Sequence, residues 1–243
     1  MKKNEAITIS LDDLVATKLE IPLLGLSIVQ RTRLTKLLNS AMEKRLTTIV
    51  APTGYGKTTL LGEWLSKRQA IDCHIAWVSL DRFDNSLVRF WCYLSAAFQK
   101  TCHLYQFSPD QISRRISEKG VYYLVNPLIN EIAKSPQKIC LILDDFQTIQ
   151  DENIHASLEY FIEHQPKNLH IIISSRSTPP IPLSRYRAQG HLVEIEAQDL
   201  SFTLSEVNTF LFSVMGLRID FEQTLALKEA TEGWIAGLKL AAI

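Results

Sequence analysis

The chain has 243 residues, and its 26 lysines and arginines balance its 26 aspartates and glutamates, so the formal net charge is zero. This balance excludes a strongly basic protein that binds nucleic acid by bulk electrostatics, and an apolar fraction of 46% excludes intrinsic disorder. No apolar run in the sequence reaches the roughly 18 residues that a membrane-spanning helix needs. The length suits one large domain, or one domain and the start of another.

The four cysteines show no C-x-x-C pair, so we expect reduced, buried thiols and a cytoplasmic protein. The six histidines are scattered, and none is paired with a cysteine at metal-binding spacing. The only metal that we expect is therefore Mg²⁺.

A lead-in segment covers residues 1–45 and has helical spacing from Leu34 to Met42. Beyond it, short apolar runs alternate with helix-length amphipathic stretches. Strands are predicted at 47–51, 74–80, 138–144, 169–174 and 191–195, and helices at 58–67, 87–100, 122–133 and 154–164. Residues 103–120 look irregular or weakly helical, and a proline-rich turn spans 179–182.

Strands that are apolar on both faces and separated by helices indicate an α/β fold, with a parallel central sheet flanked by helices. We expect residues 46–200 to form one P-loop nucleotide-binding domain. After about residue 200 the strands stop, and helices are predicted at 205–214 and 221–231. We expect 201–243 to be the start of a helical lid domain. The chain stops on an apolar helical turn, so we also expect a longer protein.

The strongest motif is a phosphate-binding loop in which alanine replaces the first glycine of G-x-x-x-x-G-K-[ST]. Gly54 and Gly56 let the backbone N–H groups turn inward around phosphate oxygens. Lys57 brings a charge to the β- and γ-phosphates, and Thr58 offers its hydroxyl to Mg²⁺. The nucleotide-binding residues of this loop are Pro52, Thr53, Gly54, Tyr55, Gly56, Lys57, Thr58 and Thr59. A chance glycine-rich turn is the alternative, which the strand before the loop and the helix after it disfavour.

Two carboxylates follow the predicted strand 138–144, at the edge where ligands of parallel sheets sit. Asp144 is the candidate Mg²⁺ ligand, through water, and Asp145 is the candidate catalytic group that orients or deprotonates an attacking water. The alternative is that the pair caps the next helix.

Arg176 ends the predicted strand 169–174. If this strand neighbours the acidic strand, the guanidinium points toward the γ-phosphate and reports its presence, because guanidinium pairs bidentately with phosphate. A surface arginine in a turn is the alternative.

These elements together resemble the MalT-like, LuxR-type ATP-dependent transcription regulators, within the signal-transduction ATPases called STAND. The resemblance begins near Ile28 and rests on residues 51–61, 63–64, 76–81, 84–85, 141–145, 174–176, 179–183, 194–195, 199–203 and 231–238. It implies an ATPase switch: ADP holds a resting monomer, and ATP with an inducer permits oligomerisation, under slow hydrolysis. It also implies a following helical arm, an inducer-sensing superhelix and a DNA-binding helix-turn-helix, none of them within these 243 residues.

The resemblance assigns two arginines. Arg31 matches the family's N-terminal motif, which lies near the adenine. Arg176 matches the first sensor arginine of this ATPase class. The sequence departs from the pattern at Thr53, where alanine is usual. It departs again at 233–235, where related adaptor ATPases have a proline beside the base.

We therefore expect a module that binds ATP or ADP with Mg²⁺, in a cleft between the sheet and the lid helices near Gly233 and Trp234. By itself it should be monomeric, should not bind DNA specifically and should not respond to the inducer. Two other classes stay open: a fast-turnover P-loop enzyme such as a small-molecule kinase, and a STAND ATPase adaptor that does not act on DNA.

Overall fold

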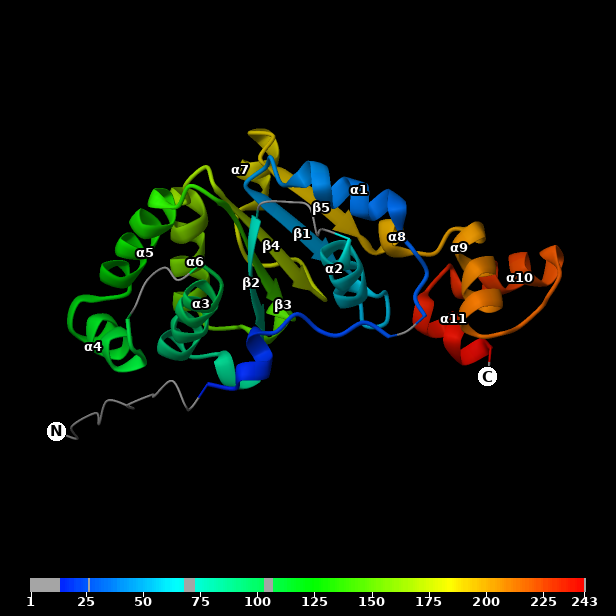
Figure 1. The fold of residues 1–243 in the computed structure, drawn as a ribbon, viewed down its shortest axis with the longest axis horizontal. Helices are drawn as coiled ribbons and strands as arrows, with labels where there is room; N and C mark the ends of the chain where they lie inside the picture. The colour runs from blue at the N-terminus through cyan, green and yellow to red at the C-terminus, as the bar shows by residue number, and fades with distance from the viewer. Residues whose placement is uncertain (1–13, 26, 68–72, 103–106, 243) are drawn as a thin grey trace.

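A computed structural model of the chain describes residues 14–25, 27–67, 73–102 and 107–242 (Figure 1). Five parallel strands form one sheet in the order β2-β3-β4-β1-β5. Their bounds are β1 Leu46–Val50, β2 Cys73–Ser79, β3 Lys138–Asp144, β4 Leu169–Ser175 and β5 Leu192–Glu196. The predicted α/β fold is confirmed, and each predicted strand lies within one residue of the observed one at both ends.

Helices cover both faces of the sheet, and alternate residues of the central strands point to opposite faces. Leu141 and Leu143 of β3 join one core, while Cys140 and Ile142 join the other. The first core is closed by α3 (Leu87–Cys102), α4 (Pro109–Lys119), α5 (Tyr122–Lys134) and α6 (Glu152–His164). The second is closed by α1 (Thr32–Ala41) and α2 (Lys57–Ser66). This two-faced burial explains why the strands read as continuous apolar runs.

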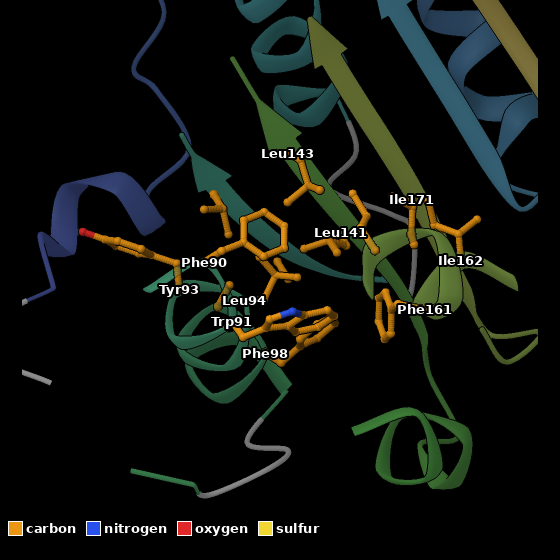
Figure 2. Close-up of a cluster of buried hydrophobic side chains, with 14 of the residues drawn as sticks. Phe90, Trp91, Tyr93, Leu94, Phe98, Leu141, Leu143, Phe161, Ile162 and Ile171 are labelled. Atoms are coloured by element: carbon orange, nitrogen blue, oxygen red, sulfur yellow. The ribbon is translucent and has the colours of Figure 1, made fainter. Parts of the chain in front are cut away.

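The aromatic residues of α3 are fully enclosed in the first core (Figure 2). The Trp91 ring packs edge-on against Phe90 and Phe161, with centroids 5.7 and 5.6 Å away. Its indole N–H donates to the Ser157 hydroxyl at 3.1 Å. These rings therefore pack within the core, where no ligand could stack on them.

Two helices differ from the sequence prediction. The weakly helical stretch contains a regular helix, α4, which begins with Pro109 and a capping box between Ser108 and Gln111. Its apolar face is narrow, so periodicity alone gave a weak signal; residues 103–106 of that stretch lie outside the described residues. A short helix, α7 (Leu183–Ala188), follows the proline-rich turn and was not predicted.

Beyond α8 (Ala197–Leu200), the chain forms a C-terminal helical segment, residues 201–242, on one side of the sheet (Figure 1). It contains α9 (Leu204–Thr209), a π-helical turn (Phe210–Val214), α10 (Phe221–Thr231) and α11 (Ile235–Ala241). The predicted helix 205–214 is thus half α-helix and half π-turn. The segment has a small core of its own, which Val29 completes from the N-terminal side.

The four cysteines are all present as thiols. Cys92 and Cys140 are buried, but Cys73 and Cys102 are only half-buried, so the prediction of four buried thiols is wrong for two of them. Burial raises the pKa of Cys92 to about 12 and that of Cys102 to about 11. Within the described part of the chain, no helix is long and apolar enough to cross a membrane.

Candidate functional site

The phosphate-binding loop connects β1 to α2 at the carboxyl edge of the sheet, between the ends of β4 and β5. Its two glycines have positive φ angles, +87° at Gly54 and +76° at Gly56, which only glycine adopts without strain. Gly56 immediately precedes the first turn of α2, so unpaired backbone N–H groups of that turn face the loop. This is the geometry of an anion site at a helix N-terminus.

Lys57 is the buried cation of the loop. Its ammonium Nζ donates to the carbonyl oxygens of Ala51 at 2.6 Å and Pro52 at 3.2 Å. Burial lowers the pKa of Lys57, and the nearby carboxylates Asp145 and Asp144 oppose that shift. The positive charge therefore sits at the loop, within electrostatic reach of both acidic residues.

Thr58 and Asp144 join the loop to the acidic strand end. The Thr58 hydroxyl donates to Oδ2 of Asp144 at 2.7 Å, across the width of β4. Asp144 is almost completely buried, and that burial raises the pKa of its carboxyl. A hydroxyl and a carboxylate are oxygen donors of the kind that Mg²⁺ takes alongside water and phosphate oxygens. The described residues hold no cluster of three or more His, Cys, Asp or Glu side chains that would cage a metal by themselves.

Asp145 is half-buried, and its backbone lies in the left-handed region at φ 58°. Such a backbone costs roughly 1 kcal/mol for a residue other than glycine. Its carboxylate Oδ1 accepts from the Gln147 amide Nε2 at 2.8 Å. Asp145 stands at the N-cap position of the 3-10 helix Phe146–Thr148 but makes no side-chain capping bond there. At the start of α6 the cap is Asp151, which accepts from Asn153 N and Ile154 N. The capping alternative for Asp144 and Asp145 is therefore not what the fold uses.

Arg176 directly follows β4, which pairs with β3 on one side and β1 on the other. The condition stated for a sensor role, that its strand neighbours the acidic strand, is thus met. The Arg176 side chain is exposed and lines a cavity of about 270 Å³ beside Pro52, Glu194 and Glu196. Its charge contributes to the lowered pKa of Lys57, after the larger effect of burial.

A second cavity, of about 110 Å³, lies between α2 and the C-terminal helical segment. Its walls are largely apolar and include Val29, Phe202, Phe210, Val214 and Ile235, with Gly56 and Thr59 of the loop region at one side. A small apolar cavity next to a phosphate-binding loop has the shape and chemistry of a base pocket.

Arg31 lines the same cavity and is buried. Its guanidinium lies 5.0 Å above the Phe202 ring, donates to the Ser201 carbonyl at 3.3 Å and is 3.5 Å from the Glu206 carboxylate. The Nη1 atom has no hydrogen-bond partner among the described residues. Burial lowers the pKa of Arg31, which Glu206 opposes.

The C-terminal helical segment rests directly on the phosphate-binding loop. The indole of Trp234 donates to the Thr53 carbonyl at 3.0 Å, and Ala236 N donates to the Gly54 carbonyl at 3.1 Å. A side-chain carbon at Gly54 would lie only 2.6 Å from Cβ of Ala236. Both bonds use loop carbonyls, so they leave the N–H groups of the cradle unused.

The structure brings all the site residues proposed from the sequence to one edge of the sheet, with Arg31 at the adjoining cavity. Sequence reasoning missed Gln147 and the apolar cavity walls, whereas it expected the nucleotide cleft near Gly233 and Trp234. The resemblance at 231–238 was the only signal for Trp234. Gln147 had none.

No known protein-family profile matches the chain. The chain is 32% identical over 230 residues to the "HTH-type transcriptional regulator MalT" of Yersinia pestis (strain Pestoides F) and to that of Serratia proteamaculans (strain 568). Each match covers 95% of this chain and 25% of the relative, so the chain spans about a quarter of these curated relatives.

Solved structures share the fold at low sequence identity. A STAND protein with a tetratricopeptide repeat sensor from Pyrococcus horikoshii matches with a TM-score of 0.56 at 16% identity, over 89% of this chain and 30% of that one. The Drosophila ORC bound to DNA matches with a TM-score of 0.57 at 8% identity, over 100% of this chain and 63% of that one.

Proposed function

Because this chain belongs to the MalT-like regulators, over the quarter of their length that it spans, we propose that it is their ATP- and ADP-binding switch module. In this proposal, slow ATP hydrolysis controls self-association of a transcription activator. The observation that carries the proposal is the 2.7 Å bond from the Thr58 hydroxyl to the Asp144 carboxylate. This bond brings the hydroxyl of a phosphate-binding loop next to the carboxylate at a buried acidic strand end, as a nucleotide-bound Mg²⁺ requires.

The roles follow from position and charge. Backbone N–H groups of the loop, from Pro52 to Thr59, bind the phosphates together with the first turn of α2. Lys57 exchanges its two carbonyl partners for β- and γ-phosphate oxygens, which are stronger acceptors because they are charged. Thr58 and Asp144 hold Mg²⁺, which neutralises charge on the phosphates when bound.

Two further residues are assigned to the hydrolysis of the γ-phosphate. Asp145 orients or deprotonates the attacking water, and Arg176 pairs with the γ-phosphate oxygens and so distinguishes ATP from ADP. Both residues follow adjacent strands of the sheet, which supports their action on one phosphate group.

The base is assigned to the apolar cavity that Arg31 lines. Its apolar walls favour a flat aromatic base, and the guanidinium of Arg31, whose Nη1 has no partner among the described residues, lies beside it as a source of a hydrogen-bond donor. Adenine fits this pattern, since its ring nitrogens are acceptors.

DNA contact and inducer sensing are proposed to lie outside these residues, and the chain by itself to be a monomer. The relatives are named helix-turn-helix regulators. Here the basic residues of α7 are engaged, Arg185 with Glu163 at 2.8 Å and Arg187 with Glu194 at 2.7 Å, and do not form an open basic face.

Titration calorimetry with ATP and Mg²⁺ tests the proposal, using the chain and two lysine variants. Lys57→Ala should weaken ATP binding at least about tenfold, because a charged hydrogen bond to phosphate is lost. Lys36→Ala removes an exposed lysine of α1 and should bind like the wild type. Unchanged affinity in a folded Lys57→Ala protein would refute the phosphate-loop assignment.

A further inference from the structure

The side-chain amide of Gln147 joins the two residues that the proposed function places around the γ-phosphate. Its Nε2 donates to Oδ1 of Asp145 at 2.8 Å, and its Oε1 accepts from the backbone N of Arg176 at 2.9 Å. One amide therefore satisfies the acidic residue after β3 and the basic residue after β4 at the same time.

This bridge lies where the sheet no longer joins the two strands. The paired residues of β3 and β4 run from Ile139 with Leu169 to Leu143 with Ile173. Past the last pair, β3 ends at Asp144 and β4 at Ser175, and the Gln147 amide links the residues that follow them. A side chain that makes one donor and one acceptor bond in a fixed plane sets both distance and orientation.

Asp145 needs such a support, because its backbone has a positive φ angle. Thr148 holds the main chain there: its N–H and its hydroxyl both donate to the Asp145 carbonyl, at 3.1 and 2.9 Å. The carboxylate is held separately, by Gln147. Main chain and side chain of Asp145 are thus fixed by two different residues.

We infer that Gln147 is a positioning residue for hydrolysis, which holds the Asp145 carboxylate in register with the point where Arg176 leaves the sheet. The inference rests on the proposed function and deepens it. It predicts that the group acting on water and the group reading the terminal phosphate are mechanically linked, so that displacement of one displaces the other.

The experiment compares single-turnover ATP hydrolysis and ADP affinity in three variants. Gln147→Met keeps the length of the side chain and removes both bonds. Gln147→Glu keeps an acceptor for Arg176 N but cannot donate to Asp145 when ionised. Gln150→Met makes the same change three residues later at an exposed position and serves as the matched control.

We expect both Gln147 variants to hydrolyse ATP about tenfold more slowly, in the range found for residues that orient a reacting group. ADP affinity and melting temperature should stay close to those of the wild type, because neither variant touches the cradle. Gln150→Met should match the wild type in all three measurements.

Three results would overturn the inference. Wild-type hydrolysis in Gln147→Met would show that the bridge is not used, and wild-type hydrolysis in Gln147→Glu would show that the bond to Asp145 is not needed. A loss of ADP affinity or of melting temperature that accounts for the slower hydrolysis would assign Gln147 to folding alone. Failure of the proposed function is distinct: the wild type would then bind and hydrolyse ATP no better than Lys57→Ala.

Discussion

The Trp234 indole N–H donates to the carbonyl oxygen of Thr53 at 3.0 Å, across 181 positions of sequence. The last helix is thereby fastened to the loop proposed to hold phosphate. The carbonyls of Thr53 and Gly54 both accept hydrogen bonds from the C-terminal helical segment. A change in the path of the loop would therefore change the position of these helices on it. The C-terminal helical segment is thus bonded to the loop itself, apart from any contact that its cavity walls would make with a base.

Gly54→Ala should weaken the contact between the C-terminal helical segment and the phosphate-binding loop. A methyl group there would lie 2.6 Å from Cβ of Ala236 and 2.7 Å from the Trp234 indole nitrogen, in a backbone at φ +87°. Gly120→Ala is the matched control, because its φ is +86° and nothing lies within 4 Å of the added carbon. Both changes add backbone strain on the order of 1–3 kcal/mol. Hydrogen exchange at Ala236 N–H should accelerate at least about tenfold only in Gly54→Ala; equal protection in the two variants would contradict the contact.

Asp144→Asn should separate metal binding from nucleotide binding. The amide oxygen still accepts from Thr58, but the charge that attracts Mg²⁺ is lost. We expect ATP affinity with Mg²⁺ to fall about tenfold and affinity in EDTA to change far less. Asp145→Asn should keep both affinities and slow hydrolysis. If both variants lost only hydrolysis, the division of roles between the two carboxylates would be wrong.

Arg176→Ala should reduce the preference for ATP over ADP by about tenfold, the value of one hydrogen bond to a charged group. ADP lacks the oxygens that this guanidinium reads, so its affinity should be nearly unchanged. Competition binding with a fluorescent ADP measures both constants. Arg114→Ala, at an exposed position of α4, controls for the loss of a positive charge. Equal losses for both nucleotides would assign Arg176 to packing.

Cys92 makes stability depend on alkaline pH. Burial raises the pKa of its thiol to about 12 in the folded chain, while the unfolded thiol ionises near its ordinary value. The unfolded state therefore loses its proton first and is stabilised as the pH rises, which lowers the free energy of unfolding. Urea unfolding under reducing conditions should show the stability gap between wild type and Cys92→Ala narrowing by about 1 kcal/mol from pH 8 to pH 10. A constant gap would contradict the burial of the thiol.

The sequence predicts the strands well because β3 and β4 are enclosed on both faces and read as unbroken apolar runs. It also indicates that Asp144 and Arg176 lie at the edge that carries the phosphate-binding loop with Lys57, because the carboxyl ends of parallel strands share one edge. Strand order could not be read in this way. Only the structure shows that β4 lies between β1 and β3, so that the bond from Thr58 to Asp144 spans β4.

The wall residues of the apolar cavity and the particular bonds of Gln147 and Trp234 could not be predicted from the sequence, for physical reasons. Phe202, Phe210 and Val214 have the spacing of ordinary core residues, so nothing distinguishes a cavity wall from a core position. The bonds of Gln147 and Trp234 join residues 29 and 181 positions apart, whereas periodicity reports only neighbours within a few turns.

The hydrogen bonds between position 31 and Glu63 of α2 are made by the main chain of Arg31 and not by its side chain. The backbone N–H of Arg31 donates to both carboxylate oxygens of the buried Glu63, at 2.9 and 3.1 Å. Almost any residue at position 31 can supply this N–H, whereas Glu63 has to be an acceptor. A survey of all substitutions would thus find that most changes at Glu63 disrupt this bond. At position 31 only proline, which has no backbone N–H, would remove it. Losses seen with Arg31→Ala would then report on the guanidinium, free of any contribution from this bond.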